Sequence, residues 1–194
     1  MNGTLITIII VAVVLVLVAV VALTLAARKR RQQRERQEEA RREYGPEYER
    51  AVDERGSEKK AESELRERRE KLEGEIQPLS DESRRKYAEQ WEEVERAFVD
   101  DPAGALDDAD RLVAEILTER NFPTESREEA TKSLGVMHSD LVEDFREAQR
   151  VHQDAVESSK RADPDAANTG TEDLEKMRRA IQEYRSVYQR LTAE

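Results

Sequence analysis

Residues Leu5 to Ala27 read LITIIIVAVVLVLVAVVALTLAA, an apolar run without a charged residue. At a rise of about 1.5 Å per residue, about 23 helical residues extend about 34 Å, enough to cross a hydrocarbon core of about 30 Å. A lone strand in lipid would leave its backbone N–H and C=O groups without hydrogen bonds, whereas a helix pairs them internally. The run therefore predicts a transmembrane helix over residues 5–27.

The two flanks of this apolar run differ in charge. Residues 1–4 precede it and contain no lysine or arginine, whereas four cations follow it at once. Because basic flanks remain on the cytoplasmic side, we expect a single-pass cell-membrane protein with its N-terminus outside and the remainder of the chain cytoplasmic. Besides fixing this topology, the four cations are candidates for contact with anionic lipid head groups, which makes the bilayer an expected partner. They are Arg28, Lys29, Arg30 and Arg31.

The amino-acid composition favours one fold class and argues against several kinds of function. Of the 194 residues, 40% are charged and 5% aromatic, and seven glycines with five prolines are too few for a turn-rich β protein. An abundance of Ala, Glu, Arg, Gln and Leu favours helices, so we predict an all-α fold. The formal net charge of −11 argues against a nucleic-acid partner, because binding to phosphates needs clustered cations. The absence of cysteine excludes disulfides and thiolate chemistry.

The stretch after the predicted membrane helix, residues 28–79, is predicted to be a basic juxtamembrane segment followed by a charged helical stalk. Proline at position 46 removes a backbone donor and disfavours helical geometry in the preceding residue, so we expect a hinge near Gly45. A short helix should run from Pro46 to about Arg55 and stop at Gly56. The next helix, Glu58 to Glu73, has few apolar residues, which predicts a solvated stalk; they are Ala61, Leu65 and Leu72.

Residues 80–194 are predicted to form a small helical bundle. Ser80 should cap a helix from about Asp81 to Val99, and Asp101 with Pro102 should start another that ends near Asn121. The remaining predicted helices run from Thr124 or Ser126 to Leu134 and from Asp140 to about Ser159, followed by a last helix capped by Thr171. Gly135 is expected to close the first of these three, and residues 160–170 to form a loop.

Five aromatic side chains in this bundle are candidates for a pocket or a partner-binding face. Their spacing at three and four residues is that of a helix seam, which favours a role in the core. A ligand pocket or a groove for a partner helix remains the alternative. The five are Tyr87, Trp91, Phe98, Tyr184 and Tyr188.

The sequence contains no strong catalytic or metal-binding motif. The two histidines, His138 and His152, lie near acidic residues, but their spacing matches neither zinc nor di-iron patterns, so capping or surface roles are favoured. No nucleophile and base stand in a recognisable motif, and no phosphate-binding loop is found. We therefore expect no catalytic residue, cofactor or metal, and not an enzyme.

Several segments resemble an uncharacterised bacterial family of small single-pass membrane proteins. They are Gly45-Pro46-Glu47-Tyr48-Glu49-Arg50, Ala61-Glu62-x-Glu64-Leu65, Phe98-Val99-Asp100-Asp101-Pro102, Ala109-Asp110-x-Leu112-Val113 and Thr171-Glu172-Asp173-Leu174. The resemblance covers most of the chain beyond the apolar run and implies a bacterial membrane protein. It implies no activity, so no residue role follows from it.

Three hypotheses follow from these observations. The leading one is a membrane-anchored adaptor or scaffold whose helical domain binds another protein. The second is a small-ligand sensor or an enzyme without known motifs, using a pocket around Tyr87, Trp91 and Phe98. The third is self-association through a seam of Tyr184, Tyr188 and Leu191.

Overall fold

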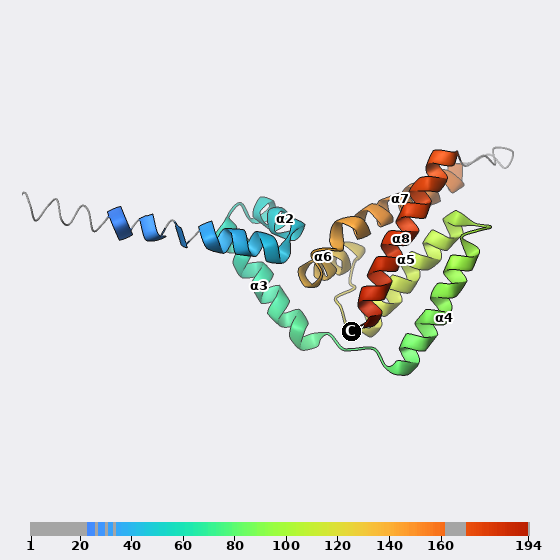
Figure 1. Ribbon diagram of the computed structural model, residues 1–194, viewed down its shortest axis with the longest axis horizontal. Coiled ribbons are helices and arrows are strands. Elements are labelled where there is room, and N and C mark those ends of the chain that lie inside the picture. The colour runs from blue at the N-terminus through green and yellow to red at the C-terminus, as the bar shows by residue number, and fades with distance from the viewer. Residues whose placement is uncertain (1–22, 26, 30, 33, 162–169, 194) are drawn as a thin grey trace, which may run out of the picture. The chain divides into compact units, whose positions relative to one another are not determined.

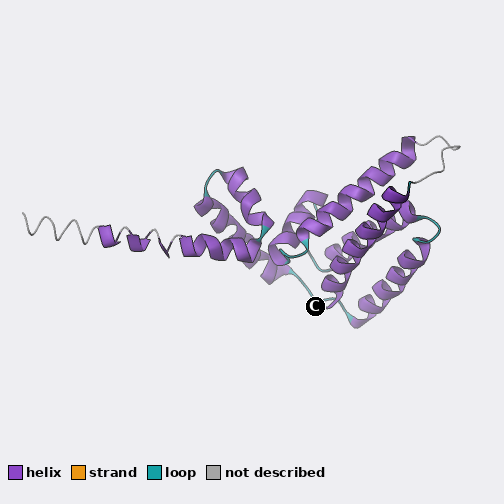
Figure 2. Cartoon of the chain, turned by 45° about the horizontal axis from the view of Figure 1, so that its top comes forward, coloured by secondary structure: helices purple, strands orange, loops and turns teal. Residues whose placement is uncertain are grey.

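A computed structural model describes residues 23–25, 27–29, 31–32, 34–161 and 170–193 of the chain (Figure 1). All regular secondary structure in these ranges is helical, and the ribbon in Figure 2 contains helices and loops only. The prediction of an all-α fold is therefore confirmed.

The predicted membrane helix lies mostly outside the described part of the chain, because residues 1–22 and 26 are not described. In the ranges that are described, the structure has no helix of sufficient length and apolar character to span a bilayer.

The chain divides into two compact units, residues 1–43 and Tyr44–Glu194. In the first unit, residues 34–43 are helical. The second unit begins at the predicted hinge, where Gly45 has a φ of 51°, a conformation that favours glycine. Pro46 then starts the next helix. The helices of the second unit are α2 (Pro46–Arg55), α3 (Glu58–Glu75), α4 (Asp81–Ala97), α5 (Pro102–Glu119), α6 (Arg127–Met137), α7 (Val142–Arg161) and α8 (Thr171–Ala193).

Helix α5 is central to the bundle, since it packs against α4, α7 and α8. Its N-terminus is held by Asp101, whose side chain accepts a hydrogen bond from the Gly104 backbone N–H at 2.9 Å, with proline at the first helical position. Apolar side chains of these helices are buried in this core. Its members include Val94, Leu106, Val113, Ile116, Phe145 and Leu191.

The prediction of a solvated stalk is wrong. Helix α3 packs against α2 and α6, and its three apolar residues, Ala61, Leu65 and Leu72, are at most 1% exposed. Three small or medium side chains are enough because they share one narrow face of the helix. The compact unit consequently starts at Tyr44, not at residue 80.

Helix α6 also differs from its predicted bounds. The Ser126 side chain accepts a hydrogen bond from the Glu129 backbone N–H at 3.1 Å and caps the helix, as predicted. The helix passes through Gly135 and ends at Met137 instead of stopping at Leu134. Gly135 is a close-approach position within the helix: an added Cβ would lie 2.8 Å from Glu47 Cγ and 2.8 Å from Val142 Cγ2.

Candidate functional site

The five aromatic candidates lie in or against the core. Trp91 and Tyr188 stack with ring centroids 4.9 Å apart, and Tyr184 meets Phe145 edge-on at 5.8 Å. Exposed fractions are 2% for Tyr87, 5% for Trp91 and 0% for Tyr184, while Phe98 and Tyr188 are half-buried against the same core. The structure therefore gives these residues the packing role that their spacing favoured.

The proposed self-association seam is also covered by the chain itself. Tyr184 and Leu191 are fully buried, and only Tyr188 of the three residues is half-exposed. A second copy could reach Tyr184 or Leu191 only if α8 moved away from α5 and α7.

The basic flank after the apolar run is described for three of its four cations. Arg28, Lys29 and Arg31 are exposed, while Arg30 lies outside the described residues. Contact with lipid head groups stays a prediction for all four.

A buried carboxylate forms the centre of a polar cluster inside the bundle. Asp110 on α5 accepts hydrogen bonds from the Tyr184 hydroxyl at 2.9 Å and from Arg127 Nη1 at 2.5 Å. His152 on α7 places Nδ1 at 3.9 Å from Asp110 Oδ2 and Nε2 at 3.2 Å from Asp107 Oδ1. We call Asp107, Asp110, Arg127, His152 and Tyr184 the polar centre. It links α5, α6, α7 and α8.

Burial and neighbouring charges shift the pKa values of two members of the polar centre, Tyr184 and Arg127. Burial, reinforced by the neighbouring Asp110 carboxylate, raises the pKa of Tyr184 far above its ordinary value, so its hydroxyl remains a donor. Burial lowers the pKa of Arg127, but its hydrogen bond to Asp110 raises it, and the pKa lies above its ordinary value as a result. Tyr184 and Arg127 therefore both donate to the Asp110 carboxylate.

Sequence reasoning missed this polar centre. The favoured surface or capping role is wrong for His152, whose exposed fraction is 7%. His138 is the C-terminal cap residue of α6, in agreement with the predicted capping role. A usable signal was the position of Asp110 among Leu106, Ala109 and Val113, because a carboxylate on an apolar helical face must find a partner when buried. Over the described residues, no group of three His, Asp or Glu side chains is arranged to hold a metal ion.

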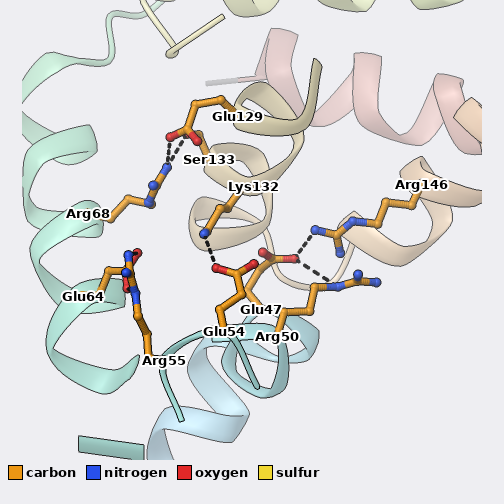
Figure 3. A network of polar contacts seen from close by, with 10 residues as sticks. All are labelled: Glu47, Arg50, Glu54, Arg55, Glu64, Arg68, Glu129, Lys132, Ser133 and Arg146. Carbon is orange, nitrogen blue, oxygen red and sulfur yellow. Dashed lines mark hydrogen bonds and ion pairs between the residues drawn. The ribbon is translucent and has the colours of Figure 1, made fainter. Parts of the chain in front are cut away.

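A second polar cluster joins α2 and α3 to α6 and α7 (Figure 3). On α2, Glu47 pairs with Arg146, and Glu54 accepts a hydrogen bond from Lys132 Nζ at 3.0 Å. We call the whole set the charged interface. Its remaining pairs are Arg50 with Glu143, whose Nη2 and Oε1 are 3.0 Å apart, and Arg68 with Glu129.

Glu47 is the most deeply placed member of the charged interface, with 1% of its side chain exposed. Its position in the first turn of α2 places the carboxylate near the positive end of the helix dipole. The missing Cβ of Gly135 leaves the space that its Cγ and Cδ occupy. Although burial opposes the effect, hydrogen bonds from Arg50 and Arg146 hold the pKa of Glu143 below its ordinary value. These carboxylates and guanidinium groups therefore neutralise one another.

The two polar clusters meet at a cavity of about 540 Å³ between α2, α6 and α7. Glu47 and Arg50 from the charged interface line it, and Arg127 from the polar centre lines it too. Four cations, Arg50, Arg127, Lys132 and Arg146, are matched by four carboxylates, Glu47, Asp53, Glu54 and Glu128. Such a lining is suited to charged and hydrogen-bonding groups of a partner, since it carries cations and carboxylates in equal number.

Comparisons of the chain with protein-family models, with curated proteins and with solved structures found no match. The family resemblance of the Gly45 to Arg50 and Phe98 to Pro102 segments therefore stays a prediction.

Proposed function

We propose that this chain is a single-pass membrane protein whose helical unit binds another protein at the cytoplasmic face, as an adaptor or scaffold. The observation that carries the proposal is an uncharged apolar run of membrane-spanning length, followed by a one-sided basic flank and then by the compact helical unit Tyr44–Glu194. An anchor of this kind confines the helical unit to a membrane surface, which raises its effective concentration for partners on that surface.

The cavity between α2, α6 and α7 is the surface that we propose for the partner. Asp53 on α2 and Glu128 on α6 line it and are exposed, and Arg50 and Arg127 are half-exposed at 49% and 56% of their side chains. Exposed charges of both signs favour recognition of a polar, charge-patterned protein segment, since complementary charges set specificity more than affinity.

Membrane topology is the first test of this proposal. A C-terminal tag on the full chain is expressed in bacterial spheroplasts, which are treated with protease before and after lysis. Protection of the tag until lysis is expected. Digestion in intact spheroplasts would refute the cytoplasmic placement.

Partner binding needs a second test with a matched control. A photo-crosslinking residue at position 53 or 128 of the full chain should give a discrete adduct in membranes, because both positions line the cavity. The control carries the same residue at the exposed position of Glu89 on α4. Adducts at none of these positions, or equal adducts at all three, would count against a docking surface at the cavity.

A further inference from the structure

The α2–α3 hairpin differs from the other helices in what holds it to the bundle. Among the described residues, the main apolar core takes its members from α4 to α8, with Leu79 and Phe122, and none from α2 or α3. The buried apolar side chains of the hairpin, such as Tyr48 and Leu65, lie outside that core. The hairpin therefore lacks the contacts that unite the five later helices.

Ion pairs add to the apolar packing of the hairpin against α6. The charged interface spans from α2 and α3 to α6 and α7 in four pairs, of which Glu47 with Arg146 is the most buried. Figure 3 draws the pairs of Glu47, Glu54 and Glu129. The other three are partly exposed, with 50% of the Glu54 side chain and 36% of the Glu129 side chain in solvent. Partly exposed pairs are individually weak and are screened by salt.

One end of the hairpin is fastened by hydrogen bonds that involve no acidic side chain. The Asn121 side-chain amide donates to the Glu75 carbonyl oxygen at 3.0 Å. The Gln77 backbone N–H donates to the Arg120 carbonyl oxygen at 2.9 Å, and Arg120 Nε donates to the Gln77 carbonyl oxygen at 3.2 Å. At the other end, Gly45 has a positive φ next to the first turn of α2. The hairpin is therefore held by hydrogen bonds near Glu75–Gln77, and elsewhere by ion pairs and by the packing of α3 on α6.

We propose that the α2–α3 hairpin is a flap that pivots about Glu75–Gln77 and is latched to α6 and α7 by the charged interface. In the closed state α2 supplies one wall of the 540 Å³ cavity, through Glu47, Arg50 and Glu54. Opening removes that wall and separates Lys132 and Arg146 from their α2 partners. The flap is thus a conformational device, and it goes beyond the proposed function because it needs neither a membrane nor a bound partner.

Hydrogen exchange on the full chain in detergent micelles tests the flap, because local opening appears as exchange independent of global unfolding. Raising the salt from about 0.1 M to about 1 M shortens the Debye length from about 10 Å to about 3 Å. The α2 and α3 amides are expected to exchange about fivefold faster at the higher salt, with α5 and α8 unchanged.

Charge reversal provides a second, independent arm. Lys132→Glu places two carboxylates together at Glu54 and should accelerate exchange in α2 and α3. The double variant Glu54→Lys with Lys132→Glu restores an attractive pair and should return the exchange toward its original rate. The matched control is Lys176→Glu, which reverses an exposed lysine paired with Glu172 within α8.

The expected pattern is a response of the α2 and α3 amides to salt and to Lys132→Glu, with none to Lys176→Glu. Two results would overturn the flap. One is exchange in α2 and α3 that stays in step with α5 at both salt concentrations. The other is an equal effect of the Lys132 and Lys176 reversals. The salt arm uses the unaltered chain, so the test stands even where a variant does not fold.

Discussion

The Glu47 carboxylate on α2 accepts a hydrogen bond from the Arg146 guanidinium on α7 in a site where only 1% of the Glu47 side chain is exposed. Ninety-nine positions separate the two residues in the chain. A buried carboxylate without its cation is strongly unfavourable, so this pair is the most buried of the ion pairs that tie α2 to the second half of the bundle.

Replacing Glu47 by alanine should loosen the attachment of α2. Removing one partner of a buried pair costs about 3–5 kcal/mol, and the lower end is expected because Arg146 is 23% exposed and keeps Glu143. The readout is the opening free energy of the α2 amides from hydrogen exchange. Glu147→Ala, which removes an exposed intrahelical pair with Arg150, should change it by less than about 0.5 kcal/mol. Equal losses in the two variants would contradict a special role for Glu47.

Gly135→Ala should destabilise the fold although alanine is the better helix former. The new Cβ would lie 2.8 Å from atoms of both Glu47 and Val142, and such overpacking costs about 1–3 kcal/mol. Over most of that range the cost exceeds the gain of about 1 kcal/mol in helix propensity. A Cβ added at Gly74 on α3 would meet no atom within 4 Å, so Gly74→Ala should be neutral or stabilising. Thermal unfolding followed by circular dichroism compares the pair. A gain in Tm for both variants would refute the close approach at Gly135.

Much of the helical architecture was predictable from local patterns. Helix α2 has its predicted bounds, Pro46 to Arg55, because proline and Gly56 mark its two ends. Helices α4 and α5 begin directly after the predicted caps Ser80 and Asp101, whereas Thr171, predicted as a cap, is already the first residue of α8. Caps and periodicity are local properties of the chain, so they require no knowledge of its tertiary contacts.

The charged interface and the polar centre could not be predicted in the same way. Glu47 and Arg146 appear in the sequence as two of many charged residues, and nothing local distinguishes a buried charge from a solvated one. The three apolar residues of α3 were too few to indicate burial, because their partners on α2 and α6 lie at distant positions in the chain. Both errors concern pairing between elements, which depends on the fold as a whole.

Tyr184→Phe should weaken the polar centre without disturbing packing. The substitution removes the hydroxyl that donates to Asp110 at 2.9 Å and keeps the ring against Phe145. Hydrogen bonds to a charged acceptor contribute about 1.5–3 kcal/mol, and a loss near the lower end of that range is expected because Arg127 still donates to the carboxylate. Urea unfolding followed by the fluorescence of Trp91, the one tryptophan of the chain, measures it.

A double-mutant cycle separates this hydrogen bond from other effects of the Tyr184 substitution. In an Asp110→Asn background the further loss on Tyr184→Phe should be smaller, since the charged acceptor is already gone. Tyr184→Phe losses that are identical in the two backgrounds would show that the hydroxyl does not act through Asp110.

Glu183 on α8 should make stability depend on pH. Burial, followed by the nearby Asp144 and Glu147 carboxylates, raises its pKa from 4.5 to about 7, against an opposing effect of Arg179. Its Oε2 atom is buried without a hydrogen-bond partner among the described residues. Because the folded pKa exceeds the unfolded one, the unfolded state loses this proton first. The contribution of Glu183 to stability therefore falls as pH rises from 4.5 to about 7, and the loss is complete above that range.

Glu183→Gln removes this ionisation and isolates its effect from those of the other carboxylates. At a pH above 7 the variant should melt about 2–4 °C higher than the original chain, which corresponds to about 1 kcal/mol at this size. Near pH 4.5, where the original residue is protonated in the folded state, the two Tm values should converge. Glu89→Gln, at an exposed position on α4, should shift Tm equally at both pH values. A Glu183→Gln difference that does not change with pH would show that Glu183 is already ionised in the folded bundle at low pH.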